Sequence, residues 1–403
     1  MTQIDDSQAR RTAIIFAACQ AIVGSAAPIS FSIGGLAGYY LLDADKSLAT
    51  LPVTGFTLGV AVGAIPAAAI IKQAGQRAGF MIGTGVTALG GAIATLGLYE
   101  MSFWLFGFGL LVIGLGGAFV QQFRFAAADN APPAFKARAI SFVLAGGIVT
   151  AILGPQIVIF TREMLAPVMF AGSFVSIIGL AAVGAAILAF LRVRDGGASN
   201  SHASSEPARP LGEIIRQPLF AVGLTCAVGT YALMSFVMTG APLAMVGCGF
   251  SPDEATLGIS WHVMAMFAPS FFTGRLIARF GRERIVAIGL ALLIACALVA
   301  LSGIALWQFW SALILLGLGW NFGFIGATAM VAETYRPSEK GKVQGFHDFI
   351  LFGSVAAASF LSGVVYNAWG WDMLNWIIFP ITALCAVALG GYMLAQRKAL
   401  HAI

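Results

Sequence analysis

VRDGGASNSHASSEPARPLGEIIRQ, residues 193–217, is the only long polar stretch in an otherwise apolar chain. It is rich in serine, glycine and proline, a composition typical of a flexible linker. Of the 403 residues, 59% are hydrophobic and only 10% are charged, against about 25% charged in ordinary soluble domains. A soluble protein of this length needs more charge on its surface, so the sequence predicts an integral membrane protein.

Apolar runs long enough to cross a bilayer, about 20 residues each, occur six times before this stretch and six times after it. The first six lie near 12–41, 48–71, 79–98, 102–128, 137–161 and 167–191. The second six lie near 218–247, 254–277, 285–304, 307–332, 340–367 and 372–395. Twelve spans place both termini on the same side of the membrane.

Lysine and arginine are distributed unevenly between the two sides. Only Lys46 and Arg162 fall on the side opposite the linker. Nineteen fall on the linker side: Arg10, Arg11, Lys72, Arg77, Lys136, Arg138, Arg192, Arg194, Arg209, Arg216, Arg275, Arg279, Arg282, Arg284, Arg336, Lys340, Lys342, Arg397 and Lys398. Because positively charged loops stay in the cytoplasm, we expect a multi-pass inner (cell) membrane protein with cytoplasmic termini. The pI near 9.1 then reflects topology and not nucleic-acid binding.

The two sets of spans carry matching loops. AAIIKQAGQR (68–77) aligns with GRLIARFGRER (274–284), and DNAPPAFKAR (129–138) aligns with ETYRPSEKGK (333–342). Both matches lie between equivalent spans, and two halves of the same topology are typical of transporters that rock about a central site. We therefore expect an all-α membrane protein in which two pseudo-symmetric six-helix bundles, 1–192 and 218–403, surround a central cavity and are joined by the linker 193–217.

GRLIARFGRER resembles the loop motif of the major facilitator superfamily, roughly G-x-L-x-D-R-x-G-R-R after the second span of each half. The matching residues are Gly274, Leu276, Arg279, Gly281 and Arg282, whereas Ala278 replaces the usual aspartate. The first copy is weaker, with Lys72 at the aspartate position and with Gly75 and Arg77 retained. The resemblance implies that these loops gate the cavity and do not contact substrate. The predicted gating residues are Gly75, Arg77, Asp129, Arg138, Arg279, Gly281, Arg282, Glu333 and Lys340.

AGGIVTAILGP (145–155) resembles half of the G-x8-G-P motif of the superfamily's antiporters. Gly154 and Pro155 match, while Ala145 occupies the first glycine position. The resemblance favours export by proton antiport. The alternative interpretation is a glycine-lined, proline-softened helix contact.

The resemblance also implies that the first, fourth, seventh and tenth spans line the cavity. Aromatic rings with a few amides suit a cavity that holds an organic molecule by surface area and orients it by hydrogen bonds. The alternative for any one polar residue is hydrogen bonding between helices. The predicted substrate-binding residues are Gln20, Gln121, Arg124, Tyr231, Trp320 and Asn321, together with His262 of the eighth span.

A few ionisable residues lie deep inside the apolar runs. Counting from Pro337, Asp348 is about 16 Å along its helix at 1.5 Å per residue, with His347 beside it. Carboxylates at that depth commonly carry coupling protons, and histidine titrates near neutral pH, so we predict proton coupling at these two residues. Arg124 lies about 8 Å from the cytoplasmic end by the same count. It either neutralises Asp348 or attracts an anionic group of the substrate.

These features predict a secondary active transporter that moves a small organic solute by alternating access. Proton-coupled export is favoured; the alternative is an importer, by symport or uniport, of a small organic and possibly anionic nutrient. We expect a monomer in the lipid bilayer whose partners are a small-molecule substrate and protons, with no cofactor or metal, since the five cysteines are dispersed. A membrane-embedded enzyme would need a fuller catalytic constellation than two histidines and one aspartate provide, and the duplicated halves argue against a channel or receptor.

Overall fold

A computed structural model describes residues 6–132, 135–191 and 209–401. Every regular element in these ranges is helical, which confirms the predicted fold class. Helices suit a chain in lipid because each satisfies its own backbone hydrogen bonds. Residues 193–208 of the predicted linker lie outside the described ranges.

The amino-terminal half contains eight helices and one 3-10 turn in the described ranges. They are α1 (Asp6–Ile22), η1 (Val23–Ser25), α2 (Ala26–Leu41), α3 (Leu51–Ala74), α4 (Gln76–Tyr99), α5 (Phe103–Val120), α6 (Phe123–Asp129), α7 (Lys136–Thr161) and α8 (Ala171–Ala189). Two predicted spans are interrupted, the first at η1 and the fourth between α5 and α6. The amino-terminal half therefore makes six crossings.

The carboxy-terminal half has eight helices and a second short turn in the same ranges. They are α9 (Leu211–Ile215), α10 (Pro218–Gly247), α11 (Pro252–Phe267), α12 (Ser270–Phe280), α13 (Arg282–Leu301), α14 (Leu306–Ala332), η2 (Pro337–Glu339), α15 (Lys340–Trp376) and α16 (Ile378–His401). The bent pair α11 and α12, at 42°, together form the eighth span. Ten helical segments of the described chain are long and apolar enough to cross a membrane, or eleven with this pair.

The last of those segments, Lys340–Lys398, contains 59 residues, far more than the roughly 20 that one crossing needs. Its backbone leaves the helical region at Gly370, where φ is 75°, and α15 ends at Trp376. It therefore supplies two crossings, α15 and α16. The twelve predicted spans are all accounted for.

The duplicated loops form equivalent helix breaks. Gly75, between α3 and α4, has φ 83° and ψ 160°, and Gly281, between α12 and α13, has φ 85° and ψ 150°. Residues with a β-carbon rarely adopt this region, so each turn depends on its glycine. A contact next to each turn also recurs: Gln76 accepts a hydrogen bond from Asn130 at 2.7 Å, and Arg282 forms an ion pair with Glu333.

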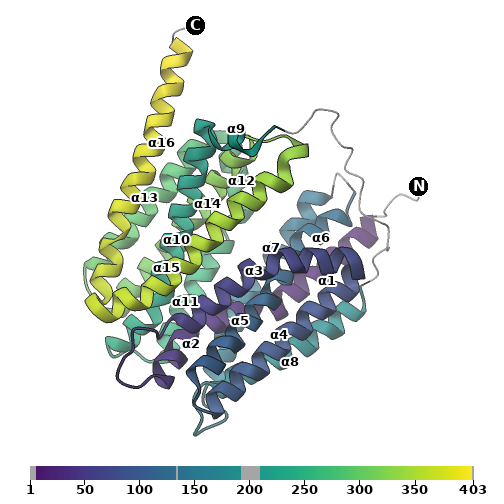
Figure 1. Ribbon diagram of the computed structural model, residues 1–403, viewed down its shortest axis with the longest axis vertical. Coiled ribbons are helices and arrows are strands. Elements are labelled where there is room, and N and C mark those ends of the chain that lie inside the picture. The colour runs from purple at the N-terminus through teal and green to yellow at the C-terminus, as the bar shows by residue number, and fades with distance from the viewer. Residues whose placement is uncertain (1–5, 133–134, 192–208, 402–403) are drawn as a thin grey trace.

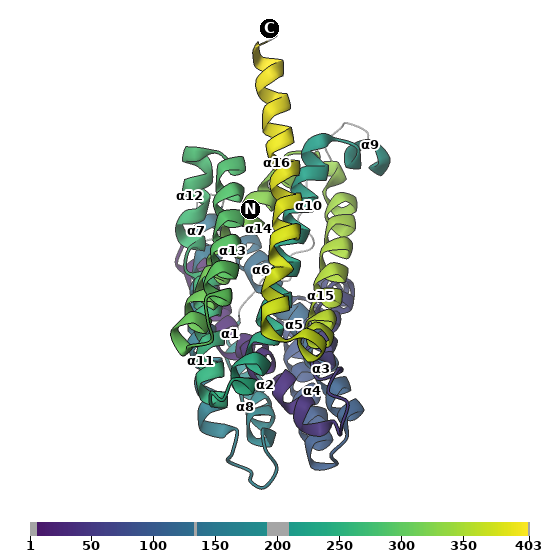
Figure 2. The ribbon, with the colours of Figure 1, turned by 90° about the vertical axis from the view of Figure 1, so that its left-hand side faces the viewer.

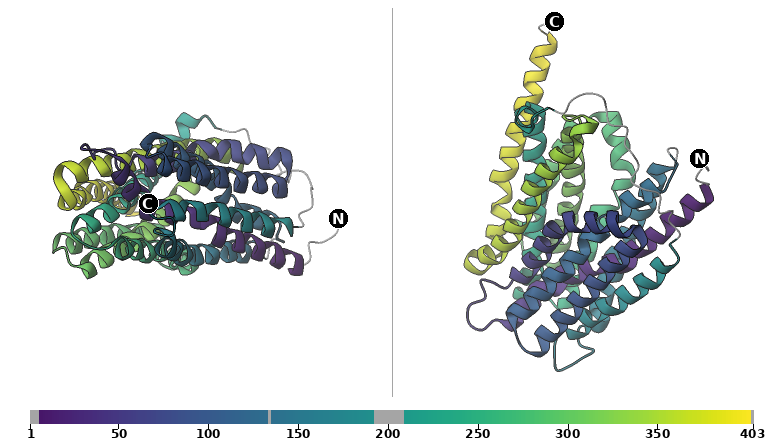
Figure 3. Two further views of the ribbon diagram at one scale, coloured as in Figure 1. Left: turned by 90° about the horizontal axis from the view of Figure 1, so that it is seen from below. Right: turned by 45° about the vertical axis from the view of Figure 1, so that its right-hand side comes forward.

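The two halves lie side by side and diverge toward the ends that carry the termini (Figure 1; Figure 3, right). We call the end at which α9 lies and α16 finishes the linker face, and the end at which α10 finishes and α11 begins the far face. The end of α16 extends beyond the other helices at the linker face (Figure 2).

Contacts between the halves gather toward the far face. Thr50 Oγ1 donates to Ser359 O at 3.2 Å, joining the start of α3 to α15. Ser260 Oγ of α11 donates to Ala151 O of α7 at 2.6 Å. Close to the same face, Arg162 forms an ion pair with Asp253 at the start of α11. The molecule is therefore closed at the far face.

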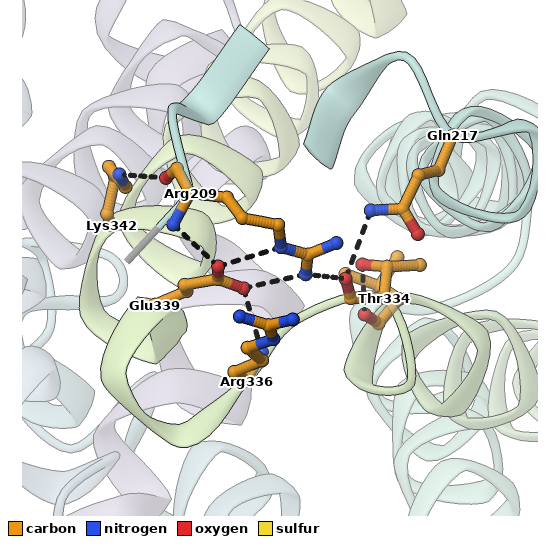
Figure 4. Close-up of polar contacts among 7 residues, drawn as sticks. Arg209, Gln217, Thr334, Arg336, Glu339 and Lys342 are labelled. Atoms are coloured by element: carbon orange, nitrogen blue, oxygen red, sulfur yellow. Dashed lines mark hydrogen bonds and ion pairs between the residues drawn. The ribbon is translucent and has the colours of Figure 1, made fainter. Parts of the chain in front are cut away.

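The end of the linker is fixed to the carboxy-terminal half at the linker face (Figure 4). Glu339 is fully buried and accepts hydrogen bonds from the backbone N, Nε and Nη2 of Arg209, each at 2.8 Å. The backbone N of Arg336 donates to the same carboxylate at 2.9 Å, and Arg209 Nη2 also donates to Thr334 O at 3.0 Å. Donors to the ionised carboxylate favour its charged form, and the Arg209 side chain foremost lowers the pKa of Glu339 well below its usual range.

Candidate substrate cavity

Two adjoining cavities lie between the halves. The chamber, of about 160 Å³, is lined by residues of both halves, mainly from α1 to α5, α7, α10, α11 and α15. The vestibule, of about 360 Å³, is lined mainly by α3, α5, α6, α14 and α15. Val60, Gln121 and Phe352 line both cavities, so the two are continuous.

The chamber lining is mostly apolar and includes five aromatic rings and three methionines. Phe31, Phe56, Phe267 and Phe352 line it, and so does Tyr231. The ring of Tyr231 is held from behind by Trp320 and Phe324, at centroid distances of 5.3 and 5.0 Å. Edge-to-face packing of this kind fixes ring orientation. The chamber therefore offers a rigid apolar surface to a flat ligand.

Both interrupted spans break beside the cavities. Val23 and Gly24 of η1 line the chamber, and Gln121 and Gln122 occupy the break between α5 and α6. At the first break, Thr150 Oγ1 of α7 donates to Gln20 O at 2.7 Å, which satisfies a carbonyl next to the break. Discontinuous helices at the substrate site are a recurrent feature of transporter folds.

Gln20 and Gln121 place carboxamides at the chamber wall. The Gln20 side chain folds over Gly24, where a β-carbon would lie 2.8 Å from Gln20 Nε2. Within the described residues neither amide forms a hydrogen bond with another side chain or backbone group. Each has a donor and an acceptor available for a ligand.

The vestibule holds the charged residues. Arg124 lines it, with its guanidinium 4.8 Å from the Phe125 ring centroid. His347 and Asp348 line it from α15, and the His347 Nδ1 to Asp348 Oδ1 distance is 2.9 Å. Asp348 is 56% exposed. A proton can therefore reach this carboxylate from the open cavity.

The two alternatives for Arg124 differ in geometry. In the described chain no carboxylate oxygen lies within 4.0 Å of its guanidinium, although Asp348 lines the same vestibule. A permanent Arg124–Asp348 ion pair is thus absent from this conformation. The guanidinium is free to meet a ligand.

Three predicted substrate residues do not line either cavity. Asn321 is buried and donates to Met266 O at 2.7 Å and Ser270 Oγ at 2.8 Å, while its Oδ1 accepts from Thr273 at 2.6 Å. These hydrogen bonds join α14 to α11 and α12. Because they occupy both N–H donors and the oxygen of the Asn321 amide, the amide is not presented to a substrate in this conformation.

His262 and Trp320 also face helix interfaces. His262 is buried, and its Nδ1 lies 2.8 Å from Leu313 O of α14. Trp320 is 8% exposed and stacks on Phe324 at 5.2 Å. Trp320 supports Tyr231 from behind, so its contribution to the chamber is indirect.

The predicted gating residues lie at the linker face. Within the described ranges, the ion pairs that these predicted residues form are those of Arg282 with Glu283 and Glu333, all within the carboxy-terminal half. Arg77, Asp129, Arg138 and Lys340 are exposed, as is Arg279, whose guanidinium lies 5.2 Å from the Phe280 ring. A role in closing this face remains a prediction, because the halves are apart here.

Gly154 and Pro155 lie inside α7. A β-carbon on Gly154 would come within 2.6 Å of Pro28 Cγ and 3.0 Å of Ser25 O. The glycine therefore permits close packing of α7 on the interrupted first span. This packing agrees with the alternative interpretation of the motif as a glycine-lined helix contact. It gives no support to the prediction of export by antiport.

Other chamber residues were not among the predicted set. Phe31, Phe56, Thr150, Phe267 and Phe352 come mainly from spans that the resemblance did not mark as cavity-lining. In the sequence, the feature that could have identified the aromatic ones is a phenylalanine surrounded by small residues such as glycine, alanine and serine. In the described chain no group of three or more His, Cys, Asp or Glu side chains could hold a metal ion.

The sequence profile of the Major Facilitator Superfamily matches residues 12–268 and, again, 225–402. The chain belongs to this superfamily. The resemblance carried by the repeated loops is therefore confirmed, and the fold of two six-helix bundles is the fold of the Major Facilitator Superfamily.

Individual transporters are also similar to this chain. The riboflavin transporter RfnT of Brucella anthropi is 50% identical over 388 residues, which cover 96% of each chain. An uncharacterised MFS-type transporter of Bacillus subtilis, YddS, is 32% identical over 379 residues, covering 88% of this chain and 85% of its own. Family and relatives together make this chain a multi-pass membrane transporter of a small organic solute and not an enzyme.

Proposed function

We propose that this chain transports riboflavin, or a flavin with the same ring system. The observation that carries the proposal is 50% identity to a riboflavin transporter over 96% of both chains. The aromatic chamber supports it, since a flat tricyclic ring buries most surface between rigid aromatic walls.

Transport proceeds by alternating access of a monomer. The cavities open through the vestibule toward the linker face, and the halves meet at the far face through Thr50, Ser359, Arg162 and Asp253. The excess of lysine and arginine on the linker side supports cytoplasmic termini in the inner (cell) membrane. This conformation is then the inward-facing one.

Asp348 couples transport to protons, with His347 as its hydrogen-bond partner. The pair lines the vestibule through which the substrate passes. A carboxylate that must be neutral in one conformation and charged in another links proton movement to the rocking of the halves. The predicted gating residues close the linker face in the alternate conformation.

The direction of net transport is a separate question, because a secondary carrier is reversible and follows the gradients imposed on it. Export by antiport remains the prediction from Gly154 and Pro155, and import by symport remains the alternative. Imposing the same pH gradient in the two orientations distinguishes them, since antiport and symport accelerate flavin movement in opposite directions relative to the proton flow.

Proteoliposomes with reconstituted wild-type protein test the proposal. We expect saturable riboflavin flux that a pH gradient accelerates, absent from liposomes without protein. Asp348→Asn should lose the pH-driven component and keep riboflavin counterflow. Absence of any flavin flux would overturn the substrate, and unchanged pH dependence in Asp348→Asn would overturn the coupling residue.

A further inference from the structure

The two continuous cavities differ in chemistry. The chamber presents phenylalanine, tyrosine and methionine side chains, and its polar lining is uncharged. The vestibule presents Arg124, His347 and Asp348 together with glutamines. A ligand that spans both must have one flat, largely apolar end and one polar, flexible end.

We propose that the flavin binds with its isoalloxazine ring in the chamber and its ribityl chain in the vestibule, where Arg124 recognises the chain. This inference rests on the proposed function, because it assumes a flavin substrate. It adds the orientation of the ligand and a specificity-determining residue.

The chamber suits the ring through its aromatic lining and through amides that match the ring's one polar edge. Aromatic side chains of the lining offer surface to the faces of the ring, and one of them, Tyr231, is held in place by Trp320 and Phe324. The imide edge of the ring carries two carbonyl acceptors on either side of an N–H donor. A carboxamide has a matching acceptor and donor, and the amides of Gln20 and Gln121 form no other hydrogen bond within the described chain.

The ribityl chain fits the vestibule because its four hydroxyls need partners. Arg124 offers up to five N–H donors and Asp348 offers acceptors, and both line this cavity. The chamber has hydroxyls of its own, on Thr57, Thr87, Thr150 and Ser235, but each already donates to a backbone carbonyl. In the reverse orientation most ribityl hydroxyls would therefore face the apolar part of the lining. Unpaired hydroxyls in such surroundings are strongly unfavourable.

Arg124 is available for this role in the present conformation. No carboxylate of the described chain lies within 4.0 Å of its guanidinium, which lies 4.8 Å from the Phe125 ring centroid. Gln121, which lines both cavities, lies at the junction where ring and chain are joined. A single ligand can therefore contact Gln20, Gln121 and Arg124 in that order.

Two probes separate the contributions of ring and chain. Riboflavin has both parts, whereas lumiflavin has the same ring with a methyl group in place of the ribityl chain. Binding of each to purified protein is measured by flavin fluorescence for wild type, Arg124→Gln and Gln20→Leu. Arg284→Gln is the matched control, because Arg284 is an exposed arginine outside both cavities.

Arg124→Gln should weaken riboflavin binding on the order of tenfold, the loss of one or two hydrogen bonds to a charged donor, and leave lumiflavin binding unchanged. Gln20→Leu should weaken both flavins alike, because both carry the imide. Equal losses of both flavins in Arg124→Gln, or an unchanged affinity for riboflavin there, would overturn the orientation. Failure of both flavins to bind wild type would overturn the proposed function itself.

Discussion

Arg162 of α7 and Asp253 of α11 form the ion pair that joins the two halves at the far face, with Nε 2.9 Å from Oδ1. A second contact, Nη2 to Oδ2, is 3.3 Å long. Only the second contact has hydrogen-bond geometry, so the pair combines a close contact between opposite charges with one charge-assisted hydrogen bond, which is stronger than a hydrogen bond between neutral groups. Since the two residues belong to different halves, the pair must break when the far face opens.

Asp253→Asn should therefore shift the molecule toward the conformation that opens at the far face. A Thr57→Cys reporter in the chamber, in a Cys248→Ser background, should react several-fold faster with a membrane-impermeant thiol reagent applied at that face. Cys248 is replaced because it is exposed. Glu163→Gln is the control, because Glu163 also contacts Arg162, at 3.0 Å, but within the same half. Equal labelling in both variants would argue against a gate.

Gly363 of α15 allows the halves to meet beside Thr50. A β-carbon at Gly363 would lie 2.3 Å from Thr50 Oγ1, whereas one at Gly353 on the same helix would meet nothing within 4 Å. Gly363→Ala should destabilise the closed far face by about 1–3 kcal/mol, as overpacking does, and slow riboflavin exchange. Gly353→Ala should behave as wild type in the same flux assay. A wild-type rate for Gly363→Ala would show that the contact relaxes without consequence.

The span pattern was predictable because crossing a bilayer demands a long apolar helix, and the breaks at Gly75 and Gly281 followed from a repeated turn. Counting along a helix also gave an expected depth for Asp348. It did not give the direction in which a side chain points around the helix. Asn321 and His262 were therefore assigned to the cavity, although the packing of α11 and α12 turns them into helix interfaces.

Contacts between segments far apart in the chain could not be predicted from the sequence. Arg162 was visible only as one of two cations on its side, and nothing in the sequence marked Asp253 as its partner, because their pairing depends on how the two halves dock. The start of α11, next to Asp253, does have a local sequence signal: Ser251 and Glu254 form a capping box there. Likewise, the burial of Glu339 beneath Arg209 depends on the path of the linker.

Glu339→Gln should lower the thermal stability of the protein at neutral pH, because Arg209 loses its ionised partner. The depressed pKa of Glu339 sets the pH dependence. The carboxylate contributes its full stability above its ordinary pKa of 4.5, and that contribution is lost as pH falls toward the lower folded value. The difference in melting temperature between wild type and Glu339→Gln should thus stay constant above about pH 5.5 and shrink below about pH 4.5.

Glu213→Gln serves as the control for that measurement, since Glu213 is an exposed carboxylate in α9 at the same face. It should melt as wild type does at every pH. A difference for Glu339→Gln that grows on acidification would contradict the sign derived from its pKa.

Asn321→Ala should destabilise the protein by about 1–3 kcal/mol, because buried partners on α11 and α12 are left without hydrogen bonds. Riboflavin affinity of the folded fraction should be unchanged, since the amide does not line either cavity. Unfolding curves and binding isotherms on the same preparation check both statements. A weakened affinity with unaltered stability would restore Asn321 as a substrate contact.

Arg124 and Asp348 provide the last prediction, because the two line one vestibule without forming an ion pair. If they were paired, each single substitution would leave an unpartnered charge, and the double variant would be more stable than either single one. Since no ion pair is present, the coupling energy of Arg124→Gln and Asp348→Asn in a double-mutant cycle should be well below the several kcal/mol of a broken buried ion pair, with only the longer-range attraction between the two charges contributing.

Transport assays should also distinguish the roles of Arg124 and Asp348. Arg124→Gln should lose riboflavin counterflow, because the substrate contact is gone, and adding Asp348→Asn should not restore it. Asp348→Asn alone should keep counterflow, because the amide oxygen still accepts hydrogen bonds from the ribityl hydroxyls. It should lose the response to a pH gradient, because the amide cannot carry the coupling proton. A double variant that regains both stability and counterflow would mean that Arg124 neutralises Asp348 during the transport cycle, with substrate recognition assigned elsewhere in the vestibule.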